Sequence, residues 1–86
     1  MKVLMKPIEM IAWFTREGKP RPIKFRILQP DGYQTIRVGR VLFQSEEKLA
    51  GNRMFLYRCQ SVVSGHEKVY ELKYELNTCK WYIYKL

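Results

Sequence analysis

Residues 68–86 read KVYELKYELNTCKWYIYKL, and this stretch decides the fold. Its first part alternates apolar and polar side chains, which is the period of a strand with one buried face. Asn77-Thr78 then provides a short turn. Folding the chain back at this turn sets Tyr74 opposite Trp81 and Glu75 opposite Lys80. Because apolar residues meet apolar ones and the acid meets a base, the stretch predicts an antiparallel hairpin.

Two earlier segments show the same alternation. Residues 53–63 carry Phe55, Tyr57 and Cys59 on one face, and either register at the turn Ser64-Gly65-His66 keeps them on the side of Leu72 and Tyr74. Residues 22–28 carry the apolar residues Ile23, Phe25 and Ile27 on one face and Lys24 and Arg26 on the other.

Gln29-Pro30-Asp31-Gly32-Tyr33 is a turn, because proline presets the first central dihedral angle and glycine accepts a positive φ. Pairing Leu28 with Tyr33 across this turn puts Phe25 against Ile36 and Lys24 against Arg37. This register keeps the apolar residues of both strands on one face.

The remaining segments are less regular. A strand is predicted at 9–14, and another from 35 to 43, with a bend or bulge near Gly39 of the kind found at barrel corners. One long strand buried on both faces beyond residue 40 is the alternative. Ser45–Asn52 is predicted to be a connection in which Ser45 caps one helical turn and Gly51 ends it. Trp13 and Trp81 are both expected in the core.

The chain has 86 residues, so one domain spanning 1–86 is expected, with residues 1–8 as a loosely ordered N-terminal arm. No segment has the length and 3.6-residue period of a helix. About six strands joined by short turns form an antiparallel meander. Since a twisted sheet tends to close its edges, the prediction is an all-β fold, either an SH3-like barrel or a strongly curled sheet.

The formal charge of +8 attracts nucleic acids, phosphates and anionic membrane surfaces. Residues 1–44 carry nine Lys/Arg against three acids, a net of +6, whereas residues 45–86 carry seven against five, a net of +2. No signal peptide or membrane-spanning segment is recognisable, so a cytoplasmic protein is expected. Cys59 and Cys79 fall two strands apart, beyond disulfide reach, and are expected to be reduced and buried.

Nothing in the sequence indicates catalysis. His66, the one histidine, falls in a turn, and Glu71 and Glu75 alternate with Lys73 on what reads as a solvated, charge-balanced face. Phosphate-binding glycine loops, dinucleotide fingerprints and metal-ligand spacings are absent. We therefore expect a protein that is not an enzyme and has no metal, cofactor or evident small-molecule ligand.

The candidate functional residues are basic. Lys24 opposite Arg37 would repel, and a bound polyanion would relieve that repulsion and release counterions. Aromatic rings beside such cations can stack on bases. The candidate contacts to DNA or RNA are Lys19, Arg21, Lys24, Arg26, Arg37, Arg40 and Tyr33. The alternative for this face is that its charge only keeps the protein soluble.

A second hypothesis is protein–protein interaction, with a partner protein or in a homodimer. Tyr82 and Tyr84 are adjacent on one face of the C-terminal strand. If that strand is a sheet edge, a partner could add a strand to it.

Several positions resemble an uncharacterised family of small bacterial all-β domains. They are Pro7-Ile8-Glu9, Trp13, Gly18, Pro20, Phe25, Val41-Leu42, Tyr70-Glu71-Leu72, Thr78 and Trp81-Tyr82. The resemblance implies a stand-alone protein of unknown function with no catalytic residues. Some relatives are encoded near translesion or repair DNA polymerases, which implies an accessory role in DNA repair. The segment Ser45–Asn52 has no clear counterpart in those relatives.

Overall fold

The computed structural model describes all 86 residues as seven antiparallel strands with no helix. The strands are β1 (Val3–Phe14), β2 (Pro20–Gln29), β3 (Gly32–Arg37), β4 (Arg40–Leu49), β5 (Asn52–Val63), β6 (His66–Glu75) and β7 (Lys80–Lys85). They form one sheet in the order β3-β2-β1-β7-β6-β5-β4. The all-β prediction is confirmed, with seven strands instead of six. The structure contains no helix of the length and apolarity needed to cross a membrane.

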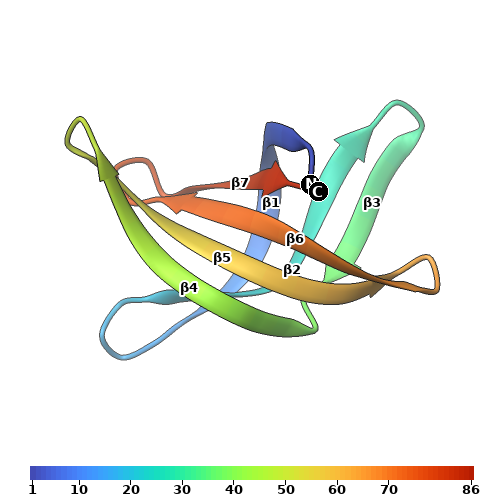
Figure 1. Cartoon of the computed structure of the whole chain (residues 1–86), viewed down its shortest axis with the longest axis horizontal. Helices are drawn as coiled ribbons and strands as arrows, with labels where there is room; N and C mark the ends of the chain where they lie inside the picture. Colours follow the sequence, from blue (N-terminus) through green and yellow to red (C-terminus); the bar gives the residue numbers. More distant parts are fainter.

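Strand β1 joins the two halves of the sheet. Its first part pairs with β7, from Val3 to Ile8, and its second part pairs with β2, from Glu9 to Phe14. The sheet therefore curls, so that β1–β3 pass behind β4–β7 in Figure 1. β3 and β4 are its two edges, and they are not paired with each other, so the sheet is not a closed barrel.

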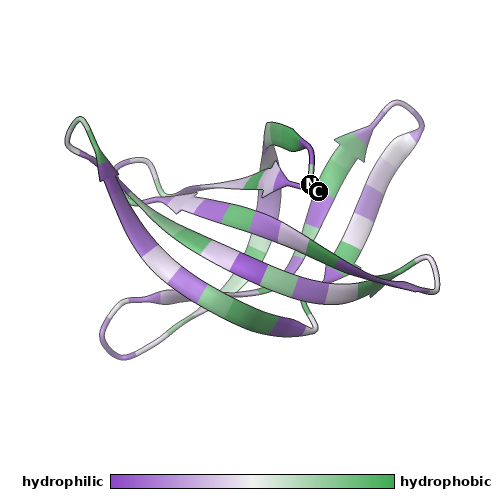
Figure 2. Ribbon diagram, viewed as in Figure 1, coloured by the Kyte–Doolittle hydropathy of each residue, from purple (hydrophilic) through white to green (hydrophobic).

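The core lies between the two halves. Its residues alternate with polar ones along the strands, as the bands of colour along β5 and β6 show (Figure 2). The Phe25 ring of β2 packs 5.6 Å from the Tyr70 ring of β6, and the Tyr57 hydroxyl donates a hydrogen bond to the carbonyl of Pro20. The buried cluster is Phe25, Ile27, Ile36, Phe55, Tyr57, Cys59, Tyr70, Leu72, Tyr74, Trp81 and Ile83.

The predicted hairpin registers are confirmed. Tyr74 lies opposite Trp81 and Glu75 opposite Lys80. Leu28 lies opposite Tyr33, and Lys24 opposite Arg37. One detail differs, because a register shift in the β1–β2 pair separates Pro22 from Lys24 and leaves the Ile23 side chain exposed instead of on the face of Phe25.

The predicted bend at Gly39 is confirmed, and the alternative of one long strand is wrong. Val38 and Gly39 separate β3 from β4, so two residues connect the opposite edges of the sheet. The Gly39 amide donates hydrogen bonds to the Gln60 carbonyl at 3.0 Å and to Ser61 Oγ at 3.2 Å. A Cβ at this position would lie 2.7 Å from the Gln60 oxygen, so only glycine allows the approach.

Two segments expected outside the sheet belong to it. Ser45–Leu49 extends β4 and pairs with β5, because Ala50 and Gly51 adopt positive φ angles of 51° and 82° and close a tight hairpin. Residues 3–8, expected in a loose arm, are strand residues because β7 pairs with them. No turn near residues 1–8 could reveal this second pairing, because β7 lies at the other end of the chain.

Two side chains expected in the core are exposed. Trp13 points outward with Glu9 and Ile11, because the inward positions of β1 are taken by Met10 and Ala12. Cys79 is exposed in the turn before β7, where its φ is 60°, whereas Cys59 is buried as predicted. Both thiols are free.

Candidate nucleic-acid interface

The outward side of β1–β3 forms an open surface that we call the basic face. Strand alternation separates it from the core, since Phe25 and Ile36 point inward and their neighbours point outward. The registers then align the outward residues in rows across the three strands. One row is Ile11, Lys24 and Arg37, and the next is Glu9, Arg26 and Thr35.

The first row places two like charges side by side. Lys24 and Arg37 are directly opposite each other on β2 and β3, and neither makes an ion pair. The third member of the row, Ile11, is 60% exposed. This row therefore offers two cations free to bind an anion beside an uncovered apolar side chain.

Arg26, in the second row, is already engaged. Its guanidinium forms an ion pair with Glu9, and the same group lies over the Tyr33 ring at 4.0 Å from the centroid. The hydrogen bond that Arg26 donates to the Glu9 carboxylate is the main reason that the pKa of Arg26 is raised. Guanidinium planes and aromatic rings can both stack on nucleobases, so Arg26 and Tyr33 together form a surface on which a base could stack.

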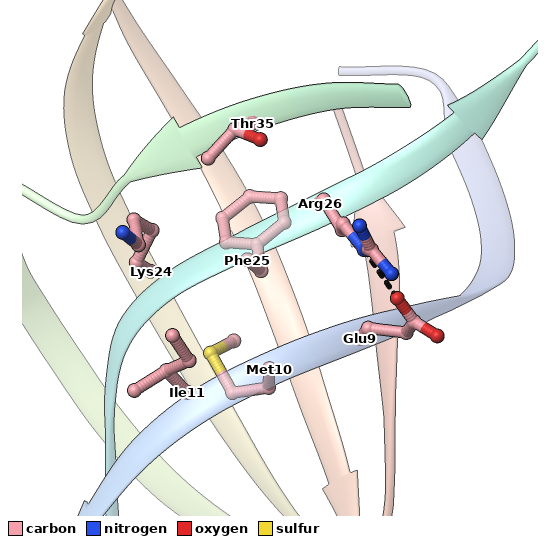
Figure 3. Close-up of a pocket in the computed structure, with 7 residues that line it drawn as sticks. All are labelled: Glu9, Met10, Ile11, Lys24, Phe25, Arg26 and Thr35. Carbon is pink, nitrogen blue, oxygen red and sulfur yellow. Dashed lines mark hydrogen bonds and ion pairs between the residues drawn. The ribbon is translucent and has the colours of Figure 1, made fainter. Parts of the chain in front are cut away.

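Two shallow grooves follow the basic face and meet at Arg26 and Glu9. The larger, about 390 Å³, is lined by Glu9, Met10, Ile11, Lys24, Phe25, Arg26 and Thr35. Lys24 and Ile11 lie at one end of it and the Arg26–Glu9 pair at the other (Figure 3). The second groove, about 150 Å³, continues past that pair and is lined by Pro7, Ile8, Glu9, Arg26, Leu28 and Tyr33.

Trp13 is a functional candidate that sequence reasoning missed. Trp13 is 69% exposed, and it lies opposite Arg21 of the neighbouring strand β2. Large exposed aromatic residues beside cations are common in surfaces that bind single strands. The sequence contained this information, because Trp13 is two and four residues from Ile11 and Glu9, so the three side chains point to the same side of β1.

The structure brings together only part of the predicted basic set. Lys24, Arg26, Arg37 and Tyr33 share the basic face, and Arg21 lies at its Trp13 end. Lys19 instead lines a groove with Gln44 and Glu46 of β4. Arg40 lies at the start of β4, in a depression with Gln60 and Glu67. Turn residues such as Lys19 do not follow strand alternation, so their direction could not be predicted.

The C-terminal strand is not an edge, so that part of the protein-interaction hypothesis is wrong. β7 lies between β1 and β6 and pairs with both. Tyr82 and Tyr84 are half-buried, and the Lys73 ammonium lies 3.8 Å from the centre of the Tyr84 ring. The expectation failed because the partner of β7, strand β1, is at the other end of the chain.

Three of the four ion pairs of the protein lie within β4–β7. The expectation of a solvated face is wrong for Glu71 and Lys73, which are both buried. Glu71 accepts two hydrogen bonds from Arg58, at 3.1 and 3.0 Å. Lys73 donates to Glu47 at 3.1 Å, and Arg53 to Glu46 at 2.7 Å. We call these strands the paired region.

Cys59 and His66 lie on β5 and β6, away from the basic face. No three His, Cys, Asp or Glu side chains lie close enough together to hold a metal ion. Burial raises the pKa of the Cys59 thiol to about 12, so it is protonated at neutral pH and is a poor nucleophile. His66 is exposed at the start of β6.

Comparisons with protein-family models, with curated proteins and with solved structures found no match for this chain. The geometry and charge of the basic face are therefore the observations from which a function can be inferred.

Proposed function

We propose that this protein is a non-enzymatic module that binds single-stranded nucleic acid across the basic face. Lys24 and Arg37 contact phosphates, and exposed bases stack on Trp13 and Tyr33. The observation that carries the proposal is the interleaving of cations without acidic partners and exposed aromatic rings on one open sheet face. If the bound strand is DNA, the protein would fit the accessory role in DNA repair that the resemblance described above implies.

The shape of the face favours a single strand over a duplex. Reading a duplex through the major groove needs a protruding helix or β-ribbon, whereas Trp13 and Tyr33 are side chains on a sheet face with shallow grooves. Stacking on aromatic rings requires bases that are not already stacked in a duplex.

The charge distribution supports the same proposal. Of the four ion pairs in the protein, only Arg26–Glu9 lies within residues 1–44, although that part carries nine of the sixteen basic residues. A phosphate backbone would neutralise these cations and release counterions, which makes binding strongly salt-dependent.

The test is a fluorescence anisotropy titration with labelled single- and double-stranded DNA and RNA, at low and physiological salt. We expect micromolar binding to a single strand that weakens steeply as salt rises. The variant Lys24→Glu/Arg37→Glu should lose about 50-fold or more in affinity. The control Lys48→Glu/Lys68→Glu changes the net charge equally at exposed sites of the paired region and should lose less than about three-fold.

Thermal unfolding followed by circular dichroism should show that both variants fold. Equal losses in the two variants would mean that binding depends on net charge alone. No binding of wild type even at low salt would leave the charge as a solubility feature and would overturn the proposal.

A second candidate function is protein binding by strand addition at β4. This strand is an edge of ten residues, and it exposes Val41, Leu42 and Phe43 in succession. Binding of an extended segment of a partner would be largely insensitive to salt, so the salt series in the titration separates the two candidates. The substitution Leu42→Lys should weaken such binding and leave oligonucleotide binding unchanged.

A further inference from the structure

Glu9 is the only acidic side chain in strands β1–β3. It lies between the two grooves of the basic face, where it holds Arg26. Arg26 thus differs from Lys24 and Arg37, which have no acidic partner. An acid at the centre of a surface that binds polyanions weakens binding, so its position calls for a functional explanation.

We propose that Glu9 is a latch that regulates the proposed nucleic-acid site, an inference that rests on the proposed function. In the free protein, Glu9 holds the Arg26 guanidinium across the junction of the two grooves and against Tyr33. A phosphate of a bound strand replaces the Glu9 carboxylate as the partner of Arg26. The second groove, with Leu28 and Tyr33, then becomes available to the next base.

The exchange is physically easy. Carboxylates and phosphates both match the planar donor fork of a guanidinium, so one charge-assisted pair replaces another. Arg26 and Glu9 are 49% and 62% exposed, so their ion pair adds little to the stability of the fold. After the exchange, however, Glu9 remains close to the bound phosphate and repels it. Glu9 therefore sets an upper limit on affinity.

The latch divides the basic face into two subsites. The first contains Trp13, Lys24 and Arg37, and no ion pair blocks it. The second contains Leu28 and Tyr33, beyond the Arg26–Glu9 pair. Trp13 lies opposite Arg21 and Tyr33 opposite Leu28, so the two rings are about 20 Å apart along β2 at the usual rise per residue. Only a strand of several nucleotides can contact both subsites.

The test compares Glu9→Gln with Glu17→Gln, which removes the same charge from the loop between β1 and β2. Each variant is titrated with a labelled 3-nucleotide and a labelled 12-nucleotide oligothymidine. We expect Glu9→Gln to bind the longer strand about five-fold more tightly than wild type, and to bind the shorter one with less than two-fold change. Glu17→Gln should change both affinities by less than two-fold.

A double-substitution cycle identifies the partner. In an Arg26→Gln background, the gain from Glu9→Gln should shrink to less than about two-fold, because no guanidinium remains to be released and only the repulsion by one carboxylate is removed. A gain of undiminished size in that background, an equal gain for both oligonucleotide lengths, or an equal gain in Glu17→Gln would each overturn the latch. Only the latch fails if three results are found together: wild type binds, Lys24→Glu/Arg37→Glu abolishes binding, and Glu9→Gln has no effect. If wild type binds no oligonucleotide, both proposals fail.

Discussion

The basic face and the paired region use the same residue types on one continuous sheet, but they differ in whether their basic side chains have acidic partners. In β4–β7, Arg58, Lys73 and Arg53 each bind a glutamate, and Glu71 and Lys73 are almost fully buried. On β1–β3, Lys24 and Arg37 face each other without an acid, and the one acid present is exposed.

This difference separates stability from binding. Buried charges must have partners within the protein, because an unpaired buried charge is very costly. Exposed like charges that remain unpaired contribute nothing to the fold and slightly destabilise it. The paired region is thus where charge supports the structure, and the basic face is where charge remains without a partner in the protein.

The two tryptophans give the largest contrast. Trp81 packs against Tyr74 and Tyr57 in the core, so Trp81→Ala should lower the free energy of unfolding by about 3–5 kcal/mol. Trp13→Ala should change it by less than about 0.5 kcal/mol but weaken oligonucleotide binding about five-fold or more. Urea unfolding and anisotropy measure the two effects. If Trp81→Ala does not fold, Trp81→Phe provides a milder variant. A large loss of stability in Trp13→Ala would contradict its assignment to the basic face.

Gly39 tests the junction between the two regions. Gly39→Ala would force its Cβ against the Gln60 carbonyl, and we expect a loss of about 2–3 kcal/mol in urea unfolding. Gly18→Asn is the control, because that position has a positive φ that asparagine tolerates and no atom within 4 Å of the added Cβ. Equal unfolding midpoints for the two variants would show that the close approach of Gly39 to the Gln60 carbonyl does not stabilise the fold.

The two glutamates test the contrast in charge directly. Glu71→Gln removes the buried negative charge and leaves a neutral amide oxygen to accept the hydrogen bonds from Arg58. It should cost about 1–2 kcal/mol, because hydrogen bonds to a charged group are stronger but the half-exposed arginine can regain water. Glu9→Gln should cost less than about 0.5 kcal/mol. Chemical unfolding of both variants is the measurement. Similar costs would remove the distinction between the two regions.

Acid should have the smallest effect, and it should arise in the paired region. The hydrogen bond from Arg53 lowers the pKa of Glu46, and those from Thr78 and Asn52 lower the pKa of Glu75. Their stabilisation is complete above the usual carboxyl pKa of 4.5 and is lost as the pH falls below it. We expect the melting temperature of Glu46→Gln/Glu75→Gln to fall less between pH 7 and pH 3.5 than that of wild type. An equal fall would place the acid sensitivity elsewhere.

Local signals made part of this structure predictable. The hairpin at Asn77-Thr78 and the turn at Pro30-Asp31-Gly32 fixed their registers, because each brings together residues that are close in the chain. The same registers placed Lys24, Arg26 and Arg37 on one face with Tyr33. Strand alternation thus predicted the centre of the candidate site.

Long-range pairing made the rest unpredictable. The pairing of β1 with β7 leaves no local signal, and it decides both that residues 3–8 are ordered and that Tyr82 and Tyr84 are not on an edge. The polar run at Ser45–Lys48 reads as a loop, yet it forms an edge strand in which polar side chains are tolerated. The role inferred for Glu9 depends on its contact with Arg26, which only the β1–β2 register reveals.

The shared strand β1 has a consequence for how the chain folds. The hairpins β2–β3, β4–β5 and β6–β7 can each form by closing a short loop, but the pairing of β1 with β7 closes almost the whole chain. That closure costs about 2 kcal/mol more in entropy than closing a hairpin, so it is expected to come late in folding. Until it forms, the two halves of the sheet are held together mainly by the link at Val38 and Gly39. Substitutions at the β1–β7 contact should therefore speed unfolding more than they slow folding.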